Sequence, residues 1–136
     1  MRTVYQFKHN KRQIAAIQNA TRTTEEFGIE PTHGVVGTDE WWSNIQSGRL
    51  LVHTLRGLIS RVYMGSMRDW PEFSLTVPTG ETTNWTREAD SDELFQMYVE
   101  GRAIELDYVL QNHRKKSWDK GSQTKMVLAI RIEEDA

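Results

Sequence analysis

Two segments near the carboxyl end of the chain alternate apolar and polar side chains with a period of two. In the first segment, the apolar side chains that share one phase are Ile104, Leu106, Tyr108 and Leu110. In the second, they are Met126, Leu128, Ile130 and Ile132. Because successive side chains of a strand point to opposite faces of a sheet, each segment predicts a β-strand with one buried face. The fold must therefore contain a sheet that packs against a core.

A long strand is predicted from Arg49 onward, and its alternation slips by one residue. The apolar phase first holds Leu51, His53, Leu55, Gly57 and Ile59, and it then continues at Val62 and Met64. A one-residue slip is what a β-bulge produces, so we expect the strand to bend after Ile59. Residues 72–77 and 81–88 follow as two strands joined by a tight turn at residues 78–80, which predicts a hairpin.

Helical spacing appears in three places. We expect a first helix over residues 11–27, after a short strand at residues 3–7, and a second over residues 39–45 that Thr38 or Asp39 caps. Asp90 precedes Glu93 by three residues, a capping-box spacing that predicts a third helix of about two turns. Residues 1–48 are thus expected as a helical extension that packs on a β-domain of residues 49–136, within one structural domain overall.

The composition excludes several classes of function. The chain has 136 residues, a formal net charge of −2 and no cysteine, which excludes disulfides, thiolate zinc sites and a cysteine nucleophile. Its four histidines lack metal-ligand spacing, and serine elbows, phosphate loops and dinucleotide glycine patterns are absent. We therefore expect no metal and no cofactor, and a binding protein more readily than an enzyme. Acid–base chemistry by a pair of carboxylates stays open, with Asp39, Glu40, Asp69 and Glu72 as candidates. The lack of a secretory signal or a long apolar run predicts a cytoplasmic protein without a membrane partner.

The order of these elements, and the residues within them, resemble the OB-fold. The resemblance is carried by Leu55–Val62, Phe73–Leu75 and Tyr98–Leu106, and it covers roughly residues 49 to 134. It implies a mainly β protein: a small, closed, five-stranded antiparallel Greek-key barrel with an N-terminal helix and a short helix between strands three and four.

The resemblance also implies a ligand site between two loops, residues 65–70 and 111–124. The second loop overlaps the segment HRKKSWDKGSQTK, which holds five basic side chains and one tryptophan. Cations that follow phosphates and aromatic rings that stack on bases are how such barrels bind single-stranded nucleic acid. Our main hypothesis is therefore a non-catalytic nucleic-acid-binding protein. Its expected contacts are Arg61, Tyr63, Arg68, Trp70, Arg114, Lys115, Lys116, Trp118 and Lys120.

Other interpretations stay open. The 113–125 segment also fits a solvated hairpin tip, because lysines keep many exposed turns soluble. The pair Trp41 and Trp42 fits a lid that closes the barrel, or a contact for a protein partner in an inhibitory or accessory module. A small-molecule-binding β-barrel is a further alternative, as is a homo-oligomer.

Overall fold

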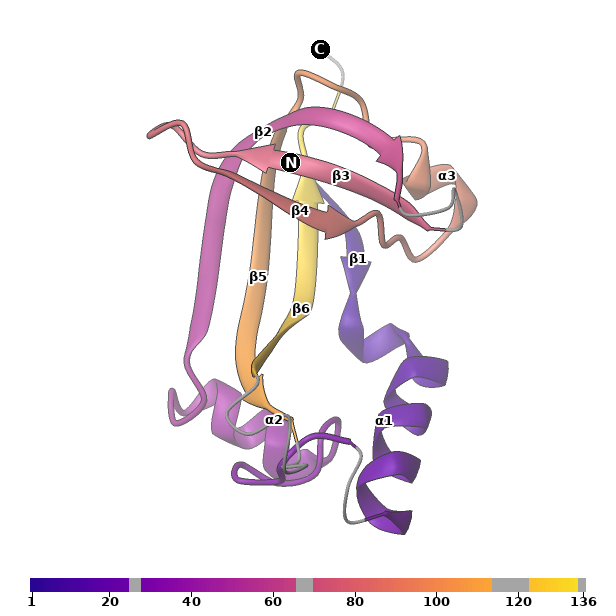
Figure 1. Ribbon diagram of the computed structural model, residues 1–136, viewed down its shortest axis with the longest axis vertical. Helices are drawn as coiled ribbons and strands as arrows, with labels where there is room; N and C mark the ends of the chain where they lie inside the picture. Colours follow the sequence, from indigo (N-terminus) through magenta and orange to yellow (C-terminus); the bar gives the residue numbers. More distant parts are fainter. Residues whose placement is uncertain (25–27, 66–69, 114–122, 135–136) are drawn as a thin grey trace. The chain divides into compact units, whose positions relative to one another are not determined.

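The computed structural model describes residues 1–24, 28–65, 70–113 and 123–134. In chain order its elements are β1 (Arg2–Gln6), the 3-10 helix η1 (Phe7–His9), α1 (Lys11–Thr23), α2 (Asp39–Gln46), β2 (Val52–Met64), β3 (Pro71–Thr76), β4 (Thr82–Thr86), α3 (Asp92–Phe95), β5 (Ala103–Asn112) and β6 (Gln123–Ile132). Figure 1 labels the α-helices and the strands. None of the helices within the described ranges is long and apolar enough to cross a membrane.

The strands form one six-stranded antiparallel sheet in the order β1-β6-β5-β2-β3-β4. The mainly β class is confirmed, but the closed five-stranded barrel is wrong. A barrel closes only when its two edge strands pair with each other, and here β1 and β4 lie at opposite ends of the sheet. The sixth strand is β1, which pairs with β6. The small-molecule alternative relied on a closed barrel, which the described strands do not form.

The chain divides into two compact units, and β2, β5 and β6 contribute residues to both. We call residues 1–6, 54–107 and 128–136 the hairpin unit, because they include the β3–β4 hairpin. We call residues 7–53 and 108–127 the tryptophan unit, because they include Trp41 and Trp42. The expected boundary between residues 48 and 49 stays a prediction.

The hairpin unit has an apolar core to which every strand of the sheet contributes. Its buried apolar side chains are Val4, Tyr5, Ile59, Phe73, Leu75, Trp85, Tyr98, Ile104, Leu106, Leu128, Ile130 and Ile132. The predicted buried faces of β3 and β6 are therefore confirmed, and Trp85 points inward. The hydroxyl of Tyr98 donates to the Glu88 carbonyl oxygen at 2.5 Å, so this phenol keeps a partner inside the core.

The predicted β-bulge in β2 is confirmed. Ile59 pairs with Leu75 and Arg61 with Ser74, so Ser60 is the extra residue in the ladder. The strand bends in Figure 1, as a bulge requires. Gly57 lies just before this point, where a Cβ atom would collide with the carbonyl oxygen of Thr76. Only glycine permits this close approach of the two backbones.

The two α-helices of the tryptophan unit, α1 and α2, are both capped by side chains at their amino ends. The Asn10 side chain accepts a hydrogen bond from the Gln13 amide at 3.2 Å and caps α1, which ends at Thr23, before the predicted residue 27. Threonines are poor helix formers, and the hydroxyls of Thr23 and Thr24 bond back to carbonyls of the last turn. Thr38 caps α2, as one of the two predicted candidates.

The third helix and β5 differ from their predictions in detail. α3 is a single turn capped by Ser91, whose hydroxyl accepts from the Leu94 amide at 3.2 Å. β5 buries Ile104 and Leu106 as predicted, and the buried phase then moves by one residue. Its later buried side chains are Val109 and Gln111, in place of the expected Tyr108 and Leu110.

Candidate functional site

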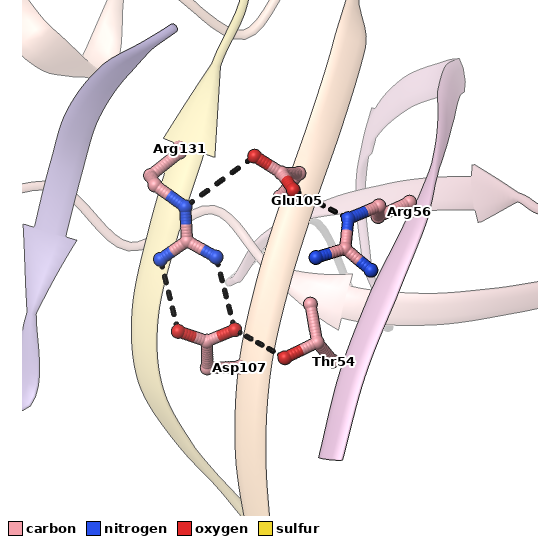
Figure 2. A network of polar contacts seen from close by, with 5 residues as sticks. All are labelled: Thr54, Arg56, Glu105, Asp107 and Arg131. Carbon is pink, nitrogen blue, oxygen red and sulfur yellow. Dashed lines mark hydrogen bonds and ion pairs between the residues drawn. The ribbon is translucent and has the colours of Figure 1, made fainter. Parts of the chain in front are cut away.

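The outward side of the hairpin unit carries a network of four charged side chains. The middle strand, β5, supplies the carboxylates of Glu105 and Asp107, while its neighbours β6 and β2 supply Arg131 and Arg56. Alternation explains their placement, because the intervening residues Ile104 and Leu106 point into the core. Figure 2 shows each acid lying between basic or hydroxyl partners.

Asp107 has the most complete set of partners. Arg131 donates from both terminal nitrogens, Nη1 to Oδ2 at 2.9 Å and Nη2 to Oδ1 at 2.9 Å, which is the bidentate geometry of a strong ion pair. The hydroxyl of Thr54 donates to Oδ1 at 2.8 Å from the other flank. Asp107 therefore ties β6 and β2 to β5 through side chains (Figure 2).

Glu105 bridges the two arginines. Its Oε2 accepts from Arg56 Nε at 2.6 Å, and its Oε1 lies 3.5 Å from Arg131 Nε. The side chain of Arg56 is 71% exposed, whereas that of Glu105 is 21% exposed. The terminal nitrogens of Arg56 have no partner among the described residues, so Glu105 orients this guanidinium while leaving its outer end open to solvent (Figure 2).

The pKa values follow from these contacts. The hydrogen bond from Arg56 lowers the pKa of Glu105, and the charge of Arg131 acts in the same direction. Burial by itself would raise the pKa of Asp107, but the hydrogen bonds from Arg131 and Thr54 outweigh burial and lower it. Both acids are therefore ionised at neutral pH, and the network holds two positive and two negative charges.

Several residues predicted as nucleic-acid contacts lie farther along β2 or near it. Arg61 lies over the ring of Tyr63, with 4.4 Å between the guanidinium carbon and the ring centroid. Trp70 is 56% exposed, and its indole nitrogen donates to the Thr86 hydroxyl at 2.9 Å. The other predicted contacts, Arg68, Arg114, Lys115, Lys116, Trp118 and Lys120, lie outside the described residues.

The tryptophan pair has a different environment. Trp41 is fully buried, and its indole nitrogen donates to Oε1 of buried Gln111 at 3.1 Å. Its ring lies edge-on to that of half-buried Trp42, with centroids 4.8 Å apart, and 5.8 Å from that of Phe7. Trp41 is thus part of the tryptophan unit's core, and any contact with a partner at this pair would fall to Trp42.

Periodicity alone did not identify the charged network. Its members occupy the polar positions of strands that were predicted correctly, but only the pairing of strands shows which opposite charges lie side by side. The available signal was the sign of the charges: two acids alternate on one segment, and basic residues occupy the polar positions of two others. Among the described residues, no group of three or more histidines and acids could hold a metal ion.

Comparison with known proteins gives one family. The family model described as "Immunity protein RhsI2" matches residues 1–133 of this chain. No curated protein matches it. The match overturns the resemblance to the OB-fold and, with it, the prediction of single-stranded nucleic-acid binding, because the matched family is one of immunity proteins.

Proposed function

The chain belongs to the immunity protein family RhsI2, and we propose that it neutralises a toxin protein by binding it directly. An immunity protein acts through a protein partner, which agrees with the inhibitory-module alternative that the tryptophan pair first suggested. The finer proposal concerns the surface that makes the contact. We assign it to the network face, defined as the side chains of Thr54, Arg56, Leu58, Glu105, Asp107 and Arg131.

Arg56 is the observation on which this assignment rests. Its guanidinium is held in one orientation by Glu105 at 2.6 Å, and its outer end is exposed. Arginine is enriched among the residues that dominate binding energy at protein interfaces, and it pairs bidentately with carboxylates. A side chain that is already ordered loses less conformational entropy when the partner binds. Arg56 therefore fits the role of an anchor for an acidic group of the toxin.

Leu58 supplies the apolar part of the same surface. It lies two residues after Arg56 on the same side of β2, and it is 51% exposed. A large exposed aliphatic side chain beside an ordered arginine combines burial of apolar area with a directional ion pair. Interfaces of standard size contain such a mixture, with the apolar anchors near the centre and charges toward the rim.

The balanced charge of the network suggests how it selects a partner. The four charges of the network cancel. Arg56 has the most exposed side chain of the four, at 71%, so its donors are the ones that a partner meets first. The outward donors of Arg56 would pair with carboxylates of an acidic toxin surface, whereas a basic surface would offer them no acceptor. We therefore propose that the contacting toxin surface is acidic.

The test compares toxin binding by the wild-type chain with binding by Arg56→Ala and Arg56→Glu, using calorimetry and survival of cells that produce the toxin. We expect the dissociation constant to rise about 10-fold for Arg56→Ala, and further for the charge reversal. Arg12→Ala, at an exposed position of α1, is the matched control and should bind like the wild type. Unchanged affinity in folded Arg56 variants would reject this surface. A wild-type chain that neither binds nor protects against the toxin would reject the function itself.

A further inference from the structure

The two edge strands of the sheet, β1 and β4, differ in the hydrogen bonds and the regularity of their outer sides. On β1, the carbonyl oxygen of Val4 accepts from the Asp90 amide at 2.8 Å, and the Gln6 amide donates to Asp90 Oδ1 at 3.3 Å. A register shift between Thr3 and Tyr5 also breaks the regularity of this strand. Side-chain coverage and bulges are devices by which proteins prevent strands from adding to an edge.

The outer side of β4 has no register shift and, among the described residues, no hydrogen bond from a distant element. Its register with β3 runs without a shift from the Glu72–Thr86 pair to the Thr76–Thr82 pair. Its five residues, TTNWT, include neither a proline nor a charge. Figure 1 shows β4 as the last strand beside β3. A regular edge without proline or charge presents its outward amides and carbonyls as a template for another strand.

The hydrogen bonds at the ends of the hairpin show which backbone groups point outward. Arg87 donates to the Pro71 carbonyl and Val77 to the Glu81 carbonyl, both at 3.0 Å. Because bonded and non-bonded pairs alternate in an antiparallel ladder, residues 83 and 85 bond to β3, and residues 82, 84 and 86 direct their amides and carbonyls away from it. The Thr86 carbonyl accepts from Glu88 at 3.0 Å, and the other outward groups have no partner within the described part of the chain.

We propose that β4 pairs with β4 of a second copy of this chain, antiparallel and centred on Asn84. In this register Asn84 exchanges two backbone hydrogen bonds with Asn84 of the partner subunit. The Thr86 amide donates to the carbonyl of Thr82 of the partner subunit, and the Thr82 amide donates to the carbonyl of Thr86 of the partner subunit. Every outward donor then meets an outward acceptor across a two-fold axis, as an isologous interface requires. The occupant is a second copy because the strand complements itself.

Charge supports the same register. In this register, two residues lie opposite each other when their numbers add up to 168. Glu81 therefore faces Arg87 of the partner subunit on both sides of the axis. Arg87 has no carboxylate partner among the described residues. Its Nη2 donates to the Tyr63 carbonyl and lies 3.7 Å from Met64 Sδ, its guanidinium carbon lies 5.1 Å from the centroid of the Phe95 ring, and its Nε has no acceptor. Opposite charges across neighbouring strands stabilise pairing. The pairing places no two like charges opposite each other between residues 81 and 87.

Sedimentation of the full chain, from micromolar to roughly millimolar concentration, tests the proposal. We expect the wild type to form a dimer that dissociates on dilution. Asn84→Lys should raise the dissociation constant about 10-fold or more, because two lysines then meet at the axis. Asn84→Glu should do the same. An equimolar mixture of the two variants should dimerise again, since lysine then faces glutamate.

Controls separate pairing from folding. Ser47→Lys adds the same charge at an exposed position after α2 and should leave the dimer intact. Asn84 also accepts from the Ser74 hydroxyl at 2.7 Å, so thermal unfolding of each variant checks the fold. Glu81→Arg, which leaves that contact in place, should weaken the dimer independently. A wild type that is monomeric throughout, a dimer indifferent to Asn84→Lys, or a mixture that fails to dimerise would each overturn the proposal. If the wild type is monomeric and Asn84→Lys loses toxin binding, the proposal is also overturned, because the toxin would then be the partner that pairs with β4.

Discussion

Each unit of the molecule connects separate elements through polar side chains, but the two settings differ. In the hairpin unit, Asp107 and Arg131 form a partly exposed ion pair on the outward side of the sheet. In the tryptophan unit, Trp41 and Gln111 form a hydrogen bond that is buried completely. Water can replace a lost partner in the first setting and not in the second. Stability should therefore depend most on the buried pair, and recognition on the exposed network face around Arg56.

The largest effect expected is that of Trp41→Ala. The substitution removes a fully buried ring that packs on Phe7 and Trp42, and it leaves a cavity in the core of the tryptophan unit. We expect the free energy of unfolding to fall by about 3–5 kcal/mol. Urea unfolding measures the change. Trp42→Ala is the matched control, and its cost should be smaller because Trp42 is half-buried. Equal losses for both variants would mean that burial does not distinguish the pair.

Gln111→Leu isolates the hydrogen bond from the packing. The leucine fills the site but cannot accept from the indole nitrogen of Trp41, which then stays buried without a partner. We expect a loss of roughly 1–3 kcal/mol in the free energy of unfolding. In a Trp41→Phe background, where no indole nitrogen needs an acceptor, the same substitution should cost much less. A loss of the same size in both backgrounds would show that the hydrogen bond contributes little.

Asp107→Asn should have the smallest effect, and that effect should depend on pH. The folded pKa of Asp107 is depressed below its ordinary value of 3.8, so its contribution is present above that value and is lost as the pH falls through the folded pKa. We expect Asp107→Asn to lower the free energy of unfolding at pH 7 by roughly 1 kcal/mol, since the pair is partly exposed to solvent.

Unfolding measured between pH 7 and pH 2 checks this expectation. The difference between wild type and Asp107→Asn should shrink toward the acid end. Thr54→Val, which removes only one of the hydrogen bonds to the carboxylate, should lie between them. A difference that stays constant with pH would indicate that the carboxylate does not carry the effect.

Local signals predicted local features well. The alternation of β6, the bulge after Ile59 and the cap at Thr38 all involve residues close together in sequence, where side-chain periodicity and capping chemistry act directly. The inward placement of Trp85 followed from the polar residues on either side of it.

Long-range features could not be predicted in the same way. The pairing of β1 with β6 joins the two ends of the chain, and nothing in the short segment at its start specifies a strand at its end as neighbour. Gln111 was missed as a core residue because an amide is buried only when a distant donor, here Trp41, satisfies it. The charged network depended on cross-strand register, so its acids were recognised as polar positions but not as partners of Arg56 and Arg131.

The bulge at Ser60 changes which residues of β2 face outward. Before it, even-numbered residues such as Arg56 and Leu58 face outward; after it, odd-numbered residues such as Arg61 take that place, opposite Ser74. Deleting this one exposed serine would restore a regular ladder in which inward Ile59 is followed directly by outward Arg61, so both halves of the strand would keep their facing. Which side chains of β2 face outward therefore depends on the number of residues in the strand. A sequence alignment of relatives that ignores a single-residue gap here would align outward side chains with inward ones.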